Sequence, residues 1–198
     1  MKNIGILTSG GDAPGMNPAI RAAVRTAIYL GYRIYGINDG FAGLIEGDIF
    51  EMNLSSVADI IHRGGTMLGT SRSDEFKTEA GLQKALDQIE KFKLDCIIVL
   101  GGDGSMMGAN SLAKAGVRTY CIPCTIDNDM GYTEFTIGFF TAVETIVDAT
   151  VKIRDTSSSH ERASVIEVMG RKCGDLAVYA GVAAGAENIV VPEKEYDL

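Results

Sequence analysis

Apolar runs alternate along this chain with glycine-rich turns and with segments in which apolar residues recur at helical spacing. The run at residues 96–100 has no polar face, which is typical of a strand buried on both sides of a parallel sheet. Gly36 interrupts another strand-like run and indicates close packing or a bulge there. Besides 96–100, strands are predicted at 3–7, 33–37, 119–122, 163–168 and 188–191.

Helices are predicted where apolar residues recur every three or four positions. The first follows Gly15 and ends near Gly31, which is placed as a C-terminal stop. The region of Gly40, Gly43 and Gly47 is expected to be rich in loops. Further helices are predicted around 57–61, at 78–92, after Ser105, at 139–154 and at 174–184.

The order strand, glycine loop, helix recurs through the chain and specifies an α/β fold. Such a pattern is built on a mainly parallel sheet with right-handed crossovers. The three serines at 157–159 form the most linker-like stretch of the sequence. A boundary between two lobes is therefore expected near them.

The turn after the central apolar run, Gly101 to Ser105, has the composition of a phosphate-binding loop. Its glycines let a ligand approach the backbone, Ser105 is expected to cap the next helix, and that helix N-terminus offers N–H groups to an anion. A carboxylate at Asp103 would repel phosphate unless a cation lies between them, and Mg²⁺ binds through one or two carboxylates plus substrate phosphates. The alternative is a tight strand-to-helix connection in which Asp103 only caps or turns.

Two other glycine loops carry candidate phosphate ligands. The loop at 8–15 looks like a phosphate cradle, although it matches no standard nucleotide-binding pattern. The loop at 64–73 ends in Arg72 among hydroxyl side chains, an arrangement suited to a polyphosphate or to a solvated surface loop. Arg21 and Arg25, one helical turn apart, either clamp a phosphate or form a solvated basic face.

Two carboxylates follow the strand predicted at 119–122, in the stretch Thr125-Ile126-Asp127-Asn128-Asp129. Ligands of open α/β sheets collect outside the carboxyl ends of the strands, so this position favours a functional role. The functional interpretation is a general base beside a metal-bound polyphosphate. The alternative is local capping of the backbone by Asp127 and Asp129.

The formal charge of -8 over 198 residues argues against a nucleic-acid partner, which needs a basic face. No apolar run approaches the roughly 20 residues of a membrane helix, and the N-terminus does not resemble a secretory signal, so we expect a cytoplasmic protein. The four cysteines are then expected to be free thiols. Cys121 and Cys124 match C-x-x-C, which leaves a redox-sensitive Cys124 open, whereas no second pair completes a metal site.

Taken together, these segments resemble the phosphofructokinase family. The central glycine loop is shared with NAD kinases and diacylglycerol kinases, whereas TIDND at 125–129 combined with MGR at 169–171 is far more specific. The resemblance implies a Rossmann-like three-layer sheet in a two-lobe architecture, truncated at the C-terminus. Residues 1–138 would form an ATP-binding lobe and 139–198 the start of a sugar-phosphate-binding lobe. The matching stretches are 8–17, 69–72, 101–105, 125–129, 160–162 and 169–175.

The resemblance implies that Mg-ATP phosphorylates fructose 6-phosphate at its 1-hydroxyl, giving fructose 1,6-bisphosphate and ADP. Asp127 would take the hydroxyl proton, with a pKa low enough to keep it ionised; Arg72 and Arg171 would neutralise charge, and Asp103 would hold Mg²⁺. The implied ATP ligands are Gly11, Arg72, Ser73, Gly102, Asp103, Gly104 and Ser105. The implied substrate ligands are Thr125, Ile126, Asp127, Asp129, Arg162, Met169, Gly170 and Arg171.

The resemblance also implies a homo-oligomer, usually a tetramer, because Arg162 reaches a neighbouring subunit's site in this family. Glycine at position 104 goes with ATP as donor, whereas pyrophosphate-dependent members carry aspartate. Cys124 replaces both the lysine of those members and the glycine usual in ATP-dependent bacterial ones. Leu54 stands where an arginine commonly holds the effector, which predicts weaker control. The implied binding residues for ADP or phosphoenolpyruvate are Arg21, Arg25, Asp59, Arg154, Gly185 and Glu187.

Family members run well beyond 198 residues, and their later part supplies further sugar-phosphate ligands. A non-catalytic ATP-binding fragment with uncovered apolar surface is therefore one alternative. A related kinase that shares the central loop, such as an NAD kinase, is another. An NAD-dependent oxidoreductase is disfavoured because the loop lacks the third glycine of that fingerprint.

Overall fold

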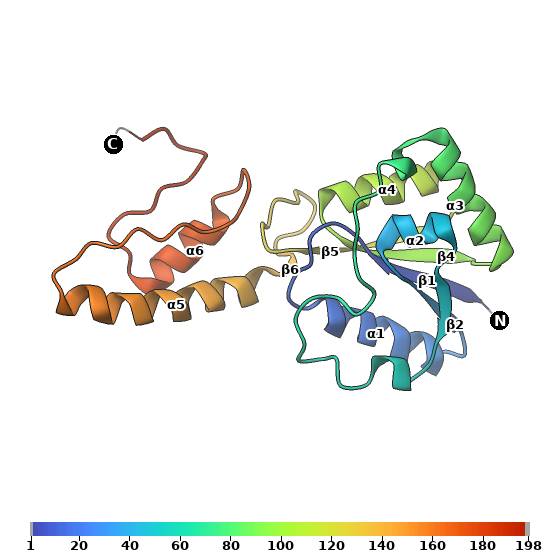
Figure 1. The fold of residues 1–198 in the computed structure, drawn as a ribbon, viewed down its shortest axis with the longest axis horizontal. Helices are drawn as coiled ribbons and strands as arrows, with labels where there is room; N and C mark the ends of the chain where they lie inside the picture. Colours follow the sequence, from blue (N-terminus) through green and yellow to red (C-terminus); the bar gives the residue numbers. More distant parts are fainter. Residues whose placement is uncertain (1, 197–198) are drawn as a thin grey trace. The chain divides into compact units, whose positions relative to one another are not determined.

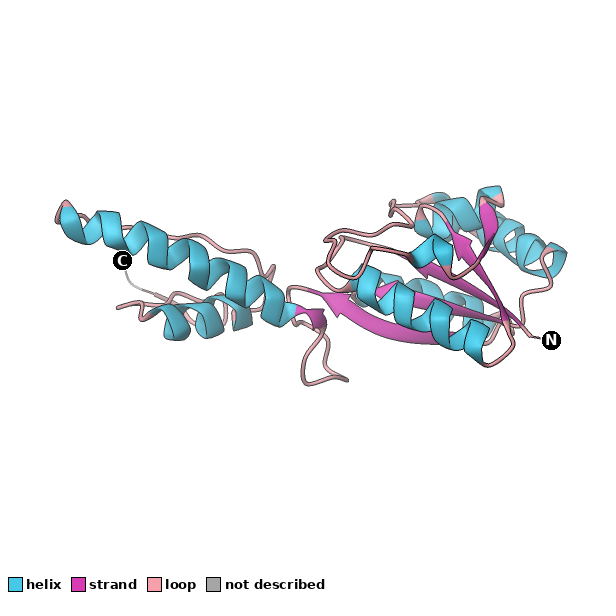
Figure 2. Ribbon diagram, turned by 90° about the horizontal axis from the view of Figure 1, so that it is seen from below, coloured by secondary structure: helices cyan, strands magenta, loops and turns pink. Residues whose placement is uncertain are grey.

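The computed structural model describes residues 2–196 and has an α/β fold (Figures 1 and 2). The chain forms two compact units, Met1–Cys124 and Thr125–Leu198. Among residues 2–196 we find no helix with the length and apolar character that crossing a membrane requires. The predicted division into lobes at 138 and 139 stays a prediction.

The first unit contains most of one sheet and the helices that cover it (Figure 1). Strands and helices alternate in it, as the recurring sequence pattern predicts. Its strands are β1 (Asn3–Thr8), β2 (Arg33–Ile37), β3 (Ile49–Met52), β4 (Cys96–Gly101) and β5 (Thr119–Thr125). Its α-helices are α1 (Met16–Tyr29), α2 (Gly40–Glu46), α3 (Glu79–Lys91) and α4 (Asp103–Lys114).

The strand order is β3-β2-β1-β4-β5-β6, where β6 is the short strand Ile137–Gly138. β1 runs parallel to both β2 and β4, and β4 runs parallel to β5. Only β3 is antiparallel to its neighbour among the pairings with a described register. The prediction of a mainly parallel sheet is therefore confirmed.

The sheet of the first unit has helices on both faces. Because side chains alternate along a strand, Leu7 and Ile97 lie on one face, where they pack with residues of α2, α3 and α4 in the main core. Ile6 and Ile34 lie on the opposite face, the side of α1 in Figure 1. This arrangement is the three-layer sandwich that the sequence predicts.

The region expected to be rich in loops instead contains α2 and β3. Its glycines have specific positions: Gly47 ends α2 with φ of 78°, a conformation that favours glycine, and so turns the chain into β3. The prediction of a helix around 57–61 is wrong as well. The structure has one short 3₁₀ turn at Ser55–Val57.

The second unit contains two packed helices, α5 (Phe139–Ser159) and α6 (Asp175–Ala184) (Figure 2). Phe139 and Val143 of α5 pack against Leu176 and Ala180 of α6. The three serines at 157–159 form the last turn of α5 and not a linker. Helix α5 therefore continues past Arg154, where the sequence predicts its end.

The strands predicted at 163–168 and 188–191 are absent from the described chain. Both segments are irregular, without strand partners, and Val165 is 99% exposed. A strand needs a neighbour for its backbone hydrogen bonds, and apolar sequence alone supplies none. Exposed apolar side chains also include Tyr120, Met169 and Val182, consistent with the expected uncovered apolar surface.

Gly36 lies in an unbroken register, opposite Ile6 on one side and Phe50 on the other, so no bulge occurs there. A Cβ atom at this position would lie 2.8–2.9 Å from the side chains of Phe50, Met52 and Leu68. Close packing is therefore the reason for the glycine.

We expect Gly36→Ala to lower the free energy of unfolding by about 1–3 kcal/mol, because three neighbouring side chains must move to admit the methyl group. Urea titration with a fluorescence readout measures the change. Gly131→Ala is the matched control, since a Cβ at Gly131 meets no atom within 4 Å. Equal midpoints for the two variants would contradict the packing argument.

Candidate active site

The carboxyl ends of β1 and β4 lie side by side at the point where the order of strands along the sheet reverses. From β1 the chain continues to β2 on one side, and from β4 it continues to β5 on the other. Ligands of open α/β sheets bind outside the strands at such a switch point. The backbone N–H of Ser9 donates to the carbonyl of Leu100 at 3.0 Å and so joins the two loops that leave these strands.

Three glycine loops meet at this switch point. The Ser105 hydroxyl donates to the carbonyl of Ser9 at 2.8 Å, and the Thr70 hydroxyl donates to the carbonyl of Gly10 at 2.6 Å. A Cβ at Gly101 would lie 2.4 Å from both the Ser9 carbonyl oxygen and the Ser105 hydroxyl, so only glycine fits. The structure thus brings the candidate ATP residues of the first unit together.

Helix α4 begins three residues earlier than predicted, at Asp103, and Ser105 does not cap it. The Ser105 side chain is buried and faces Ser9 instead. No side chain caps this helix within the described chain. The N–H groups of Ser105 and Met106 donate to the Gly102 carbonyl, so those of Asp103 and Gly104 are the ones left for an anion. Gly104 lies exposed in that turn, where a Cβ would meet nothing within 4 Å.

Asp103 is exposed at the start of α4, directly after the glycine turn. Residues 2–196 contain no cluster of three or more acidic, histidine or cysteine side chains that would enclose a metal. A single exposed carboxylate such as Asp103 suits Mg²⁺, which binds proteins through one or two carboxylates and completes its shell with water and substrate phosphates. The residues present fit a magnesium ion that arrives with its nucleotide.

Arg72 and Ser73 follow the loop that Thr70 ties to Gly10. The Arg72 side chain is exposed, which leaves its guanidinium accessible to a phosphate. The Ser73 hydroxyl accepts from the N–H of Phe76 at 3.2 Å and so starts the short turn Glu75–Lys77. Ser73 therefore has a local structural role beside any contact with ATP.

Hydrogen bonds within the loop at 125–129 and from Thr136 hold this loop in the second unit. The backbone N–H of Asp127 donates to the Thr125 hydroxyl at 3.2 Å, and Thr136 donates from its hydroxyl to the Thr125 carbonyl at 2.6 Å. Ile126, an expected substrate ligand, packs with the aromatic core around Phe139. The loop is thus anchored on an apolar side chain between its polar ones.

Asp127 has the features of a general base. It is 8% exposed, and its Oδ1 atom is buried without a hydrogen-bond partner among the described residues. Burial raises the pKa of this carboxyl, the charge of Asp129 raises it further, and Arg171 acts in the opposite direction. The shift favours the neutral form, and the expectation that Asp127 is ionised at work stays a prediction. The unpartnered oxygen argues against simple backbone capping.

Arg171 pairs with Asp129, with 3.4 Å between its Nη1 atom and Oδ2 of the carboxylate. The turn that presents it is unusual: Gly170 has φ of 145° and Arg171 has φ of 56°. A Cβ at Gly170 would lie 2.4 Å from the Cys173 carbonyl oxygen, so glycine is required. Met169, Gly170 and Arg171 line a hollow of about 400 Å³ in the second unit.

The remaining candidates lie elsewhere in the two units. Arg162 is exposed just after α5, and its backbone N–H donates to the Ser157 carbonyl at 2.9 Å. Arg154 donates to the carbonyl of Ala184 at 2.8 Å, next to Gly185, so these two effector candidates are neighbours. Glu187 is exposed nearby in sequence.

Three effector candidates lie in the first unit. Arg21 of α1 donates to the carbonyl of Val57 at 2.5 Å, whereas Arg25 is exposed on the same helix. Asp59 is exposed, with φ of 53°.

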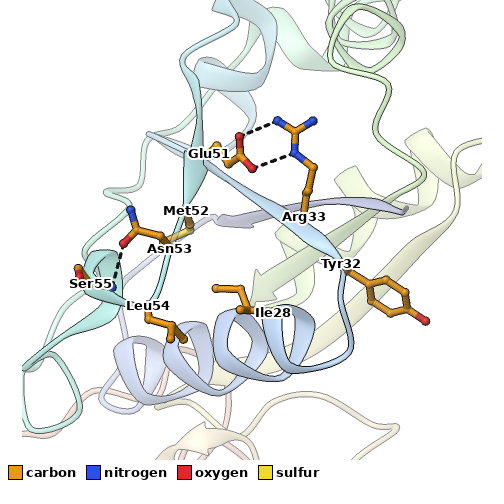
Figure 3. A pocket seen from close by; sticks show the side chains of 8 residues that line it. All are labelled: Ile28, Tyr32, Arg33, Glu51, Met52, Asn53, Leu54 and Ser55. Atoms are coloured by element: carbon orange, nitrogen blue, oxygen red, sulfur yellow. Dashed lines mark hydrogen bonds and ion pairs between the residues drawn. The ribbon is translucent and has the colours of Figure 1, made fainter.

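A hollow of about 460 Å³ lies between the end of α1 and strands β2 and β3 (Figure 3). Leu54 and Ile28 form its apolar floor, and Arg33 and Glu51 form a doubly hydrogen-bonded pair at its rim (Figure 3). Because Arg33 is paired with Glu51, the described residues that line this hollow include no unpaired cation.

The two cysteines of the C-x-x-C match do not form a pair. They are three positions apart on β5, so their side chains point to opposite faces: Cys121 is exposed and Cys124 is buried. Burial raises the pKa of the Cys124 thiol to about 12. A thiol held neutral and buried is inert, which argues against a redox role.

Sequence reasoning missed the residues that hold the site loops in place. Asn128 is the main one, since its side chain bonds to Asp175 and to the backbone of Thr136. Thr8 is another, because its hydroxyl donates to the carbonyl of Gly69 at 2.7 Å. Position inside a motif or a matching stretch is the only sequence signal for Asn128 and Thr8.

The pattern of the phosphofructokinase family matches residues 3–198. An ATP-dependent 6-phosphofructokinase of Finegoldia magna is 64% identical over 198 residues, which are 100% of this chain and 62% of that protein. One from Clostridioides difficile is 65% identical over 195 residues, which are 98% of this chain and 61% of that protein. The chain thus spans about three fifths of the length of these curated relatives.

Solved structures share the fold. Phosphofructokinase from Saccharomyces cerevisiae matches with a TM-score of 0.89 and 37% identity over 94% of this chain and 28% of that one. A pyrophosphate-dependent phosphofructokinase from Marinobacter aquaeolei matches with a TM-score of 0.82 and 22% identity over 100% of this chain and 54% of that one, a likeness of fold alone. Because the family pattern covers residues 3–198, the chain belongs to the phosphofructokinase family.

Proposed function

We propose that this chain carries the catalytic residues of an ATP-dependent 6-phosphofructokinase, which transfers the γ-phosphoryl group of Mg-ATP to the 1-hydroxyl of fructose 6-phosphate. The products are fructose 1,6-bisphosphate and ADP. One observation carries the proposal: Asp127 is a buried carboxyl with an unpartnered oxygen, beside the Asp129–Arg171 pair. Relatives with that activity in their names, 64% and 65% identical, support it.

In the proposed reaction Asp127 accepts the proton of the 1-hydroxyl as that oxygen attacks the γ-phosphorus. The bond from this phosphorus to the bridging oxygen of ADP breaks, and ADP leaves. A base with a raised pKa suits this step, because proton transfer is most effective when the pKa lies nearer the working pH. Arg171 supplies positive charge at the same place.

The first unit supplies groups for the donor. The uncapped first turn of α4 offers N–H groups to phosphate oxygens, and Arg72 offers an accessible guanidinium. When bound, Mg²⁺ would neutralise charge on the phosphates, and Asp103 is the residue that would hold it. Phosphoryl transfer asks a protein for such positioning and charge neutralisation and for no covalent intermediate.

We infer ATP and not pyrophosphate as the donor. Gly104 leaves the first turn of α4 open, whereas the pyrophosphate-dependent members of the family carry aspartate at this position. The ATP-dependent names of the relatives support the same choice. Cys124 departs from both patterns, and its burial within β5 gives it a packing role.

Three further features belong to the same proposal. The protein acts in the cytoplasm as a homo-oligomer, for which a tetramer is the expected size, and Arg162 reaches a neighbouring subunit's substrate. ADP or phosphoenolpyruvate binds at the effector residues, of which Arg154 and Gly185 lie together. Since Leu54 replaces a cationic ligand, effector binding is weaker than in members that carry arginine there.

A second candidate function is ATP binding without turnover. The names of the relatives do not favour it over the kinase. An NAD kinase is not favoured by any of the relatives described above. Assays with fructose 6-phosphate or NAD as acceptor distinguish the three.

The carboxyl of Asp127 should destabilise the fold when it ionises. Its pKa is raised, so the folded state favours the neutral form, and the penalty is present above that pKa and absent below the ordinary value of about 4. We therefore expect Asp127→Asn to raise the unfolding temperature at about pH 8 and to leave it unchanged at about pH 3. The control is Asp155→Asn, an exposed carboxylate on α5. A gain for Asp127→Asn confined to low pH would contradict the argument.

Activity tests the proposed base directly. We expect Asp127→Ala to lower kcat by about 10²- to 10⁴-fold, the usual contribution of a general base. The measurement is ADP release with fructose 6-phosphate, Mg²⁺ and ATP, with pyrophosphate or NAD exchanged in as controls. Wild-type turnover that survives the substitution would remove Asp127 from the reaction, and ATP binding with no wild-type turnover would favour the second candidate.

The donor preference is tested at Gly104. We expect Gly104→Asp to lower kcat/KM for ATP by about 100-fold, because a carboxylate in the first turn of α4 repels phosphate and fills the space for the nucleotide. The fold should be unaffected, since a Cβ there meets no atom within 4 Å. Gly104→Ala is the control for size without charge. An unchanged kcat/KM for ATP would exclude this turn from the donor site.

A further inference from the structure

Asn128 stands between the two carboxylates of the proposed site, and its side chain is fully engaged. Its Nδ2 group donates to Oδ2 of Asp175 at 2.8 Å and to the carbonyl of Glu134 at 3.3 Å. Its Oδ1 atom accepts from the backbone N–H of Thr136 at 3.0 Å. An amide is the side chain that both donates and accepts in this way.

These bonds join three segments of the second unit. Asn128 belongs to the loop at 125–129, Thr136 precedes β6, and Asp175 is the first residue of α6. A second link runs in parallel, since the Cys173 thiol lies 4.0 Å from the carbonyl oxygen of Asn128 and is oriented to donate to it. The loop with the proposed base is therefore tied to the segment that carries Met169, Gly170 and Arg171.

The backbone of Asn128 also requires this residue type. Its φ of 53° lies in the left-handed region, which asparagine tolerates better than most residues other than glycine. Glycine would meet the backbone requirement but would lose all three side-chain bonds.

The hydrogen bonds of Asn128 oppose the repulsion between two neighbouring carboxylates. The carboxylates of Asp127 and Asp129 repel each other, and Asp127 is buried away from water that would screen it. A loop free to move would turn Asp127 toward solvent, and a displacement of about 1 Å can lower a rate by about 100-fold.

We propose that Asn128 is a positioning residue, whose hydrogen bond to Asp175 fixes the loop at 125–129 so that Asp127 faces the acceptor hydroxyl while Arg171 stays beside Asp129. The proposal rests on the proposed kinase function. In the proposed reaction Asn128 touches neither ATP nor fructose 6-phosphate, and it acts by positioning Asp127 and Asp129. Asp175 is the second member of the device, and as a carboxylate at the N-terminus of α6 it is stabilised by the helix dipole.

The test exchanges the two partners. Asn128→Asp removes the donor and places one more carboxylate beside Asp175, so we expect kcat to fall by about 10- to 100-fold with little change in KM for ATP. Asp175→Asn keeps an acceptor oxygen and should stay within about threefold of the wild type. The double variant Asn128→Asp with Asp175→Asn restores a donor and an acceptor in exchanged positions. We expect it to recover most of the lost kcat.

The pH profile of kcat reports the charge beside Asp127, and the exchanged pair separates positioning from general stability. The charged groups that face Asp127 are Asp129 and Arg171, with Asp175 beyond Asn128. An added carboxylate at 128 should move the acid limb of the kcat profile to higher pH, and the exchange should move it part of the way back. The added charge displaces that limb by itself, so the deciding result is the recovery of kcat in the exchanged pair, which a merely structural role does not predict at an equal unfolding temperature.

Asn110→Asp is the matched control, because it makes the same change on the exposed surface of α4. The proposal is overturned if Asn128→Asp keeps the wild-type kcat, or if the exchanged pair is as slow as Asn128→Asp at an equal unfolding temperature. Should Asn128→Asp not fold, Asp175→Ala and Asp175→Asn take its place, and equal kcat for these two overturns the proposal. A wild-type protein without turnover on fructose 6-phosphate removes the proposed function, and this inference with it.

Discussion

The candidate donor site of the first unit depends on the contact between the ends of β1 and β4. The backbone bond from Ser9 to Leu100 and the buried hydroxyl of Ser105 on the Ser9 carbonyl hold two glycine loops against each other. The absence of a side chain at Gly101 makes the contact possible, since a Cβ there would collide with both partners. With Ser105 turned inward, the first turn of α4 is left uncapped and open to an anion.

A different constraint applies in the second unit, where two carboxylates are held close together and one of them is buried. Asp127 and Asp129 lie two residues apart, and Arg171 pairs with only one of them. The other is buried, with an oxygen that no described group satisfies. A buried polar atom without a partner is unfavourable and persists where the surroundings enforce it. Here the enforcement comes from Ile126 in the aromatic core and from the bonds of Asn128.

Where the chain departs from family patterns, the structure shows what the replacement residues do. Leu54 lies with Ile28 at the floor of a hollow beside the Arg33–Glu51 pair, where it makes apolar contact. Cys124 is buried, with its pKa raised to about 12, and it fills space at the end of β5.

The sequence by itself determined the fold class, the order of the main elements and the motifs of the site. Periodicity carries that information locally: five apolar residues before Gly101 predict β4, and the spacing of Leu82, Leu86 and Ile89 predicts α3. TIDND and MGR in turn are the motifs that carry the likeness to the family.

Tertiary structure alone decided how the side chains of these motifs are used. Ser105 has the composition of a helix cap but faces Ser9, because β1 and β4 are neighbours. Asp127 has a raised pKa because its surroundings bury it, and Asn128 became visible as an anchor only through Asp175, 47 residues away. The segment at 163–168 reads as a strand yet pairs with nothing in the described chain, since a strand requires hydrogen-bonding partners that local sequence cannot specify.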